Sequence, residues 1–282
     1  MRNLDNDQNK KTNRNFKKII LLLLATIVIA VATFIIYELA TVNNTYYIGE
    51  KNLQIPIFVY HDIVKDESEV EYDYMQTTVD KFEEQISGLM KLGYKPISYQ
   101  DLVNYKNGKT AIPKWSFLIT FDDGYMGIYE NAFKIAKKYN IPMASFVIDD
   151  KVGENGFFSW EQAKEMNDSG LISIYSHGYT HAEYNKKSAE SLKEDTDNAY
   201  SNLQHKLNRK DLLKVFTYPY GLYTDQQRTI LGKEGYVQNL TDNKINSSKK
   251  LDLTGLHRCY PLDDSVPKIL LKIQYRYIRY GA

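Results

Sequence analysis

The apolar residues of this chain predict strands and helices in regular alternation from about residue 55 onward. Short runs rich in β-branched and aromatic residues, typical of buried strands, alternate with longer segments whose apolar residues recur at helical spacing. The predicted strands cover residues 55–60, 94–98, 117–121, 142–148, 171–175, 215–218 and 236–240. The predicted helices cover residues 78–92, 100–105, 129–139, 160–167, 189–207, 224–235 and 265–280. This alternation, without internal repeats, predicts a mostly parallel sheet in one barrel-like α/β domain.

Local signals mark where several of these helices begin and end. Thr78 and Ser159 are residue types that cap helix N-termini, and Thr224 with Gln227 forms a capping-box pattern. Gly93 follows the first of these helices, where a glycine readily adopts the left-handed conformation. The boundaries of the alternating elements are therefore supported by more than apolar periodicity.

The N-terminal region has a different pattern, which predicts a membrane anchor. Residues 1–18 are polar and basic, and residues 19–37 form an uncharged, almost wholly apolar run. At helical rise this run reaches about 28 Å, close to the thickness of a bilayer core. The basic flank predicts a cytoplasmic tail, a single-pass signal anchor in a bacterial cell membrane, a stalk over residues 38–52 and an extracytoplasmic domain over residues 53–282. The alternative is a signal peptide cleaved near Ala30–Ala32, which would yield a secreted form; we favour the anchor because the apolar run continues beyond that site.

Composition excludes some classes of partner and stabilising bond. The chain has 36 Lys and Arg residues against 35 Asp and Glu residues, a balance that argues against nucleic acid as a partner. Its only cysteine, Cys259, rules out an intrachain disulfide, so a packed core must hold the fold. The 24 tyrosines suit a sugar-binding cleft, although most are explained by the preference of tyrosine for strands.

The strand predicted at 117–121 ends in two adjacent carboxylates, Asp122 and Asp123, followed by Gly124. Neighbouring like charges repel and raise each other's pKa, so an ordinary strand end has little use for such a pair. The pair makes sense where a cation binds one carboxylate and the other transfers protons. The simpler alternative is an Asp-Asp-Gly turn.

Histidines follow two other predicted strands. His177 and His181 come after the strand at 171–175, and His61 comes after the strand at 55–60. The carboxyl ends of parallel strands meet at one end of a barrel, and two histidines with one carboxylate can hold a catalytic divalent metal. The combination with the paired aspartates therefore predicts a catalytic metal site with open positions for water and substrate.

Three segments of this sequence resemble the motifs of the polysaccharide deacetylases, the NodB-homology enzymes of carbohydrate esterase family 4. They are T-F-D-D-G-Y at 120–125, S-H-G-Y-T-H at 176–181 and Y-P-Y-G at 218–221. The resemblance extends from about residue 55 to the C-terminus. It implies a distorted (β/α)7 barrel, here a single catalytic domain after the N-terminal transmembrane helix, that removes acetyl groups from polymers of N-acetylglucosamine with the help of a metal.

The resemblance also implies roles for individual residues. Asp123, His177 and His181 would bind the metal, expected to be Zn²⁺ with Ni²⁺ or Co²⁺ as alternatives, and Asp122 would be the general base. The remaining residues assigned to oxyanion stabilisation or substrate binding are Tyr220, through its backbone N–H, Pro219, Arg258 and Trp160. The alternative role for Trp160 is structural, as a cap packed on the barrel instead of a residue that lines the cleft.

Two departures from the family pattern indicate a particular branch. Thr217 stands where the family usually has an arginine that partners the base, and the C-terminal Leu-x-His motif that supplies the general acid has no clear counterpart. These departures resemble the branch that deacetylates poly-β-1,6-N-acetylglucosamine in biofilms, in which barrel elements are permuted and the acid comes from the first strand. That branch implies His61 as the acid; the competitor is His257, whose surroundings do not read as a strand end.

Three functions are compatible with the sequence. The first is deacetylation of extracellular poly-β-1,6-N-acetylglucosamine, for which polysaccharide synthase or export proteins would be partners. The second is deacetylation of N-acetylglucosamine in peptidoglycan, which the departures at Thr217 and His61 disfavour. The third is a catalytically silent sugar-binding protein, which the complete set of Asp122, Asp123, His177 and His181 disfavours.

Overall fold

The computed structural model describes residues 16–30, 33, 46–47, 53–71 and 74–281. The chain divides into two compact units, Met1–Thr45 and Tyr46–Ala282. In the first unit, residues 16–30 are helical, with their apolar side chains exposed. Among the residues with a described position, no helix has both the length and the apolar character that a membrane crossing requires. The predicted anchor at 19–37 lies partly outside the described residues, as do most of the predicted tail and stalk.

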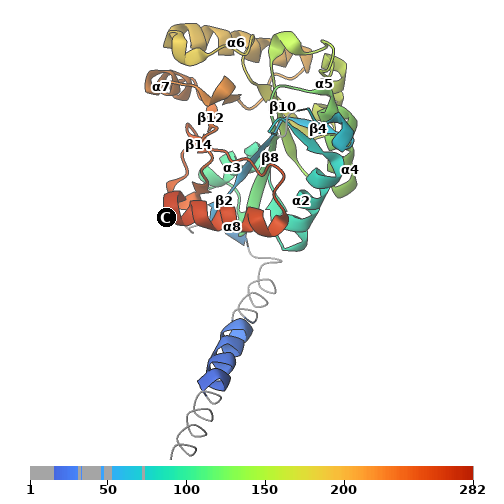
Figure 1. Ribbon diagram of the computed structural model, residues 1–282. Helices are drawn as coiled ribbons and strands as arrows, with labels where there is room; N and C mark the ends of the chain where they lie inside the picture. The colour runs from blue at the N-terminus through green and yellow to red at the C-terminus, as the bar shows by residue number, and fades with distance from the viewer. Residues whose placement is uncertain (1–15, 31–32, 34–45, 48–52, 72–73, 282) are drawn as a thin grey trace, which may run out of the picture. The chain divides into compact units, whose positions relative to one another are not determined.

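Seven parallel strands form the centre of the second unit (Figure 1). Their order is β14 (Leu256–His257), β12 (Val237–Leu240), β11 (Val215–Thr217), β10 (Ile172–Ser176), β9 (Met143–Val147), β8 (Ser116–Phe121) and β3 (Ile57–Tyr60). The two outer strands approach each other through a parallel bridge between Phe58 and Cys259. The Val59 N–H donates to the Cys259 carbonyl at 3.0 Å, and the Cys259 N–H donates to the Ile57 carbonyl at 2.9 Å. The sheet is therefore a nearly closed barrel, as the distorted (β/α)7 prediction requires.

Helices surround this barrel because its strands are apolar on both faces, as in other parallel sheets. The helices are α2 (Val79–Lys91), α3 (Tyr99–Lys106), α4 (Phe133–Tyr139), α5 (Trp160–Asp168), α6 (Ala189–Lys206), α7 (Asp225–Lys233) and α8 (Val266–Arg276). Alternate residues of one strand enter different clusters: Phe117 and Ile119 of β8 pack with residues of α2 and α8, whereas Leu118 packs with residues of α3. Burial on both faces explains why the strands read as continuous apolar runs.

The predicted boundaries hold best where side chains cap the helices. Thr78 accepts from the backbone N–H of Lys81, and both Ser159 with Gln162 and Thr224 with Gln227 form capping boxes. Other elements differ from the prediction in extent. The strand predicted at 94–98 is only β6 (Lys95–Pro96), the helix at 129–139 begins as a π-helical turn over Ile128–Ala132, and α8 ends at Arg276 before a second π-helical turn (Tyr277–Gly281).

The sequence did not predict the shortest strands. The prediction that no strand ends near His257 is wrong. Leu256 and His257 form β14 and pair with Asn239 and Leu240. Two residues are too few to show a period, so only the backbone pairing reveals this strand. The same holds for the pairs β1 (Tyr46–Tyr47) with β7 (Ile112–Pro113), β2 (Gln54–Ile55) with β13 (Asn246–Ser247), and β4 (Asp62–Val64) with β5 (Gln76–Thr78).

Candidate active site

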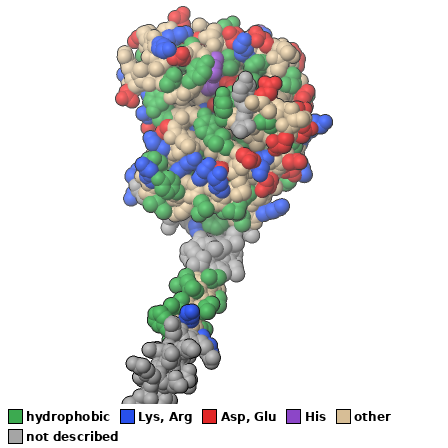
Figure 2. Space-filling view, viewed as in Figure 1, with side chains coloured by type: hydrophobic (Ala, Val, Ile, Leu, Met, Phe, Trp, Pro, Cys, Tyr) green, Lys and Arg blue, Asp and Glu red, His purple; other side chains and the backbone are tan. Residues whose placement is uncertain are grey.

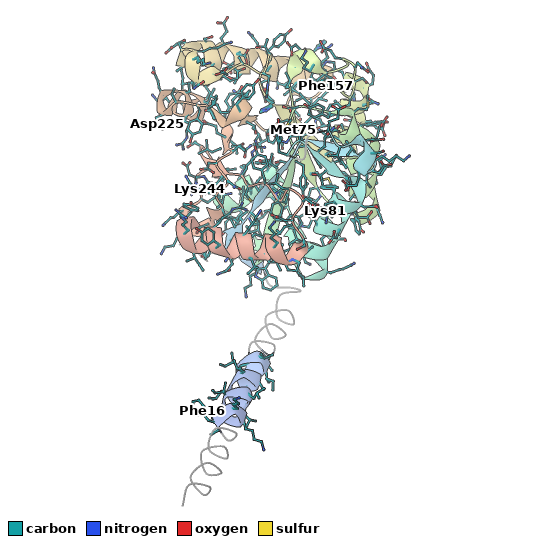
Figure 3. The ribbon with its side chains drawn as sticks, viewed as in Figure 1. Phe16, Met75, Lys81, Phe157, Asp225 and Lys244 are labelled. Atoms are coloured by element: carbon teal, nitrogen blue, oxygen red, sulfur yellow. The ribbon has the colours of Figure 1, made fainter. Side chains whose placement is uncertain are left out.

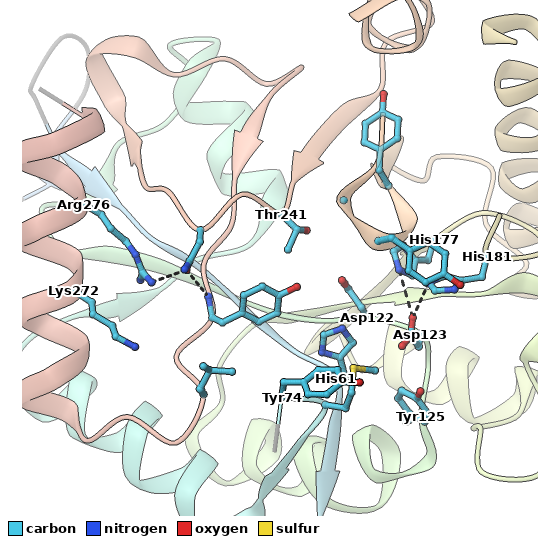
Figure 4. A pocket seen from close by; sticks show the side chains of 17 residues that line it. His61, Tyr74, Asp122, Asp123, Tyr125, His177, His181, Thr241, Lys272 and Arg276 are labelled. Atoms are coloured by element: carbon cyan, nitrogen blue, oxygen red, sulfur yellow. Dashed lines mark hydrogen bonds and ion pairs between the residues drawn. The ribbon is translucent and has the colours of Figure 1, made fainter. Parts of the chain in front are cut away.

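A pocket of about 740 Å³ opens at the carboxyl ends of the barrel strands, where ligands collect in α/β barrels (Figure 4). Figure 3 shows Met75, one of its lining residues, in the middle of the domain. The pocket is lined by His61, Tyr74, Met75, Asp122, Asp123, Tyr125, His177, His181, Tyr218, Tyr220, Gly221, Thr241, Asn243, Tyr260, Leu262, Lys272 and Arg276. The structure thus brings the predicted aspartates and three of the five histidines of the chain into one cavity.

Asp122 is held by a buried arginine that the sequence did not assign to it. Arg258 Nη1 and Nη2 donate to the two carboxylate oxygens of Asp122, each at 2.7 Å, and Arg258 is fully buried. Burial alone would raise the pKa of Asp122, but the charge of Arg258 outweighs it, and the pKa lies well below its ordinary value. Asp122 is therefore ionised, and its orientation is set by two parallel hydrogen bonds.

This pairing corrects two predictions. The arginine partner of the base is not missing, because Arg258, immediately after β14, supplies it in place of an arginine at Thr217. Arg258 is not a substrate-binding residue either, because it lies behind Asp122 and does not line the pocket. Its remaining hydrogen bonds go to the hydroxyls of Thr120, at 3.3 Å, and Thr241, at 2.7 Å.

Asp123, His177 and His181 form a cluster whose ligand atoms all lie within 4.8 Å of one another. The distances from Asp123 Oδ1 to the Nε2 atoms of His177 and His181 are 3.5 and 3.4 Å. His177 Nδ1 lies 2.9 Å from the carbonyl of Thr217, which accepts only if Nδ1 is protonated, so Nε2 is left with a lone pair toward the cluster. Asp123 Oδ1 is buried without a hydrogen-bond donor among the described residues, as expected of an atom that binds a cation. The cluster therefore fits a divalent metal.

The pKa values of these groups agree with that reading. Burial, and next the charge of Asp122, raises the pKa of Asp123 to about 7, so the carboxylate lacks a compensating positive charge. Burial lowers the pKa of His177 to about 3, so its imidazole is neutral and available as a ligand. A bound cation would favour the ionised form of Asp123 and keep both imidazoles unprotonated.

Backbone strain accompanies these side chains. Asp123 (φ 71°), His181 (φ 55°) and Tyr220 (φ 59°) all adopt the left-handed region that non-glycine residues rarely occupy. Gly178, between the two histidines, has φ 87°, and a Cβ there would collide with the Tyr184 hydroxyl. Such strain persists only where surrounding contacts impose it, and it concentrates at functional sites.

The two candidate acids occupy different places. His61 lines the pocket, with its ring stacked on Tyr260 at 6.2 Å between centroids and its Nδ1 buried without a hydrogen-bond partner among the described residues. Burial lowers the pKa of His61, although the charge of Asp122 opposes this. His257 does not line the pocket, and its Nδ1 lies 2.8 Å from the carboxylate of Asp242. Of the two candidate acids, only His61 therefore lines the pocket that contains Asp122.

Two predicted cleft residues lie elsewhere. Trp160, the first residue of α5, does not line the pocket but packs against the main core cluster, in agreement with its alternative as a structural cap. Pro219 is buried, and its neighbours Tyr218, Tyr220 and Gly221 line the cavity instead. Sequence reasoning missed Tyr74, Asn243, Tyr260, Lys272 and Arg276, which carry no motif and meet only through the fold.

Comparison with known proteins agrees with this geometry. Residues 109–238 match the sequence profile of the family described as polysaccharide deacetylase. A poly-β-1,6-N-acetyl-D-glucosamine N-deacetylase of Staphylococcus aureus is 34% identical over 170 residues, which cover 55% of this chain and 57% of that enzyme. The chain therefore matches little more than half the length of this relative.

Solved structures extend the likeness to most of the described fold. IcaB from Ammonifex degensii has a TM-score of 0.66 and 28% identity, with 82% of this chain and all of that chain covered. A deacetylase of Streptococcus pyogenes, PplD in complex with acetate, has a TM-score of 0.71 and 24% identity, covering 79% of this chain and 99% of that one, which shows the shared fold. With the family match over residues 109–238, just under half of the chain, these likenesses show that this part of the chain resembles the polysaccharide deacetylases in sequence and fold.

Proposed function

We propose that this protein removes acetyl groups from N-acetylglucosamine residues of an extracellular polysaccharide, namely poly-β-1,6-N-acetylglucosamine. The observation that carries the proposal is the pocket that joins an ionised, arginine-held Asp122 to the cluster of Asp123, His177 and His181. The name of the Staphylococcus aureus relative supports the choice of polymer.

The chain's own residues divide the chemistry among them. A divalent metal held by Asp123, His177 and His181, which we propose to be Zn²⁺, would polarise the acetyl carbonyl and activate water. Asp122 accepts the proton of the attacking water, since Arg258 occupies only two of the lone-pair positions of its carboxylate. The backbone N–H of Tyr220 stabilises the oxyanion, and His61 gives a proton to the leaving nitrogen.

The test of the substrate is acetate release from N-acetylglucosamine oligomers in β-1,6 linkage and from peptidoglycan. The full chain is purified in detergent for this measurement. We expect release from the β-1,6 oligomers and little from peptidoglycan. Release from peptidoglycan alone would replace the proposed polymer, and release from neither would contradict the activity.

The role of His61 leads to a prediction with a matched control. His61→Ala should lower kcat by on the order of 10²-fold, because a positioned acid contributes about that much, and should leave the metal content unchanged. His257→Ala should change kcat little, since His257 contacts Asp242 outside the pocket. The reverse pattern would assign the acid to His257.

The location of the protein is a separate proposal, based on residues 19–37. We propose that this run anchors the catalytic domain on the outer face of the cell membrane. The full chain should sediment with membranes, and a variant that begins at Tyr46 should not, although it contains the whole second compact unit. Recovery from the medium of a form that begins just after Ala32 would show cleavage and contradict the anchor.

A further inference from the structure

One end of the pocket is formed by the last helix, and it is cationic. Lys272 and Arg276 lie one turn apart on α8 and both line the cavity. Figure 4 shows them on the opposite side of the pocket from His177 and His181. Figure 2 shows Lys and Arg side chains gathered on the part of the surface that α8 crosses. A substrate longer than one sugar would therefore run from the metal cluster toward these two cations.

Arg276 is a buried cation, and no carboxylate of the described residues forms an ion pair with it. The residue is only 8% exposed, and its Nη2 donates to the side-chain oxygen of Asn243 at 2.5 Å. Among the ion pairs of the described residues, none includes Arg276, whereas Arg258, the other buried arginine of the site, has Asp122. The C-terminal end of a helix favours a cation, but a buried charge is ordinarily paired with an opposite one. Its positive field therefore extends into the pocket.

The charge of Lys272 is only partly neutralised. Lys272 forms an ion pair with Asp264, but the same carboxylate also pairs with Lys268 at 2.6 Å. Two cations of α8 thus share one carboxylate, and Arg276 adds a third positive charge to the same helix. The net charge of this end of the pocket is positive.

We propose that the pocket surface formed by Lys272 and Arg276 is a charge-selective subsite, which accepts a neutral N-acetylated sugar and disfavours a protonated glucosamine. The inference rests on the proposed function, because deacetylation converts a neutral amide into an amine that carries a proton near neutral pH. The reaction thus creates on the polymer the charge that this subsite repels. The consequence is spaced deacetylation, since a sugar beside an existing glucosamine is a poorer substrate.

The experiment compares oligomers of one length that differ in a single charge. One oligomer is fully N-acetylated and the other carries one internal glucosamine; both are made in β-1,6 and β-1,4 linkage. For the wild type at low salt, kcat/KM should be about 5- to 10-fold lower for the oligomer with glucosamine, as expected for like charges near a protein surface. The difference should shrink as salt screens the charges.

Variants of α8 assign the effect to the two cations. The double variant with Lys272→Gln and Arg276→Gln should turn over the two oligomers nearly equally. Arg276→Lys keeps the charge and should retain most of the preference for the fully acetylated oligomer. If the double variant fails to fold, Lys272→Gln alone serves as the test, because this side chain is 32% exposed. It should lose part of the preference for the fully acetylated oligomer. Lys268→Gln is the control, because Lys268 pairs with the same Asp264 but does not line the pocket. It should behave as the wild type.

The outcomes separate this inference from the proposed function. Equal turnover of the two oligomers by the wild type, or a preference that survives removal of both cations, would overturn the subsite. Absence of acetate from every fully acetylated oligomer would contradict the proposed function instead. In that case calorimetric binding still tests the subsite, since a fully deacetylated oligomer should bind the wild type more weakly than its acetylated counterpart at low salt, and equal or tighter binding would overturn the proposal.

Discussion

Replacing Asp122 by asparagine is expected to reduce kcat by on the order of 10²-fold or more, the usual loss when a general base is removed, while the bound metal stays. The amide keeps the size of the carboxylate but cannot accept the proton of the attacking water. Because Arg258 keeps the pKa of Asp122 well below its ordinary value, the carboxylate is ionised throughout and above the ordinary titration range of an aspartate. The loss should therefore be similar from roughly pH 5 to 8, above the ordinary titration range of an aspartate. Steady-state kinetics and metal analysis of the same samples measure both quantities.

Asp62→Asn is the matched control for this variant. Asp62 adjoins His61 in sequence, but its Oδ1 accepts from the backbone N–H of Gly127 at 3.1 Å, and the residue does not line the pocket. Asparagine keeps that acceptor, so kcat should change little. Loss of metal from Asp122→Asn would instead place Asp122 among the ligands and leave the base unassigned.

Replacing His177 by alanine should abolish metal binding and activity together. His177 is 3% exposed and contributes one of three ligand atoms, so its removal leaves two protein ligands, too few for a catalytic metal site. Loss of only an outer partner of a metal ligand costs about 10- to 100-fold in affinity, so loss of the ligand itself should exceed that. Metal content after dialysis and kcat with added Zn²⁺ are the measurements.

His205→Ala provides the comparison for a histidine outside the site. His205 lies in the last turn of α6 and does not line the pocket, so metal content and turnover should match the wild type. If His177→Ala kept a full complement of metal and wild-type turnover, the proposed metal centre would be wrong.

The polar groups at the strand ends show how far the sequence alone could reach. Asp122, Asp123, His177 and His61 each follow an apolar run, and parallel strands of one barrel end on the same side. Their convergence could thus be predicted without knowing which strands are neighbours. The assignment of Trp160 and Pro219 to the substrate cleft was less secure, because it depended on the direction of each side chain. In the fold, Trp160 packs toward the core.

Contacts between distant segments could not be predicted in this way. Arg258 is 136 residues from Asp122 and follows a two-residue strand, so neither spacing nor periodicity connects the two. Lys272 and Arg276 read in the sequence as ordinary basic residues on a helix. Their presence in the pocket depends on how the last helix packs beside the barrel.

The sequence by itself determined the alternation of strands and helices, the capped helix ends and the carboxylates and imidazoles of the site, because these depend on local periodicity, local hydrogen bonds and residue type. Only the tertiary structure decided that Arg258 holds Asp122, that His61 rather than His257 faces the cavity, and that α8 makes one end of it positive. The physical reason is that barrel closure, here through the bridge between Phe58 and Cys259, brings the first strand and the C-terminal segment together. The spacing and periodicity of neighbouring residues cannot predict that these two segments lie close together.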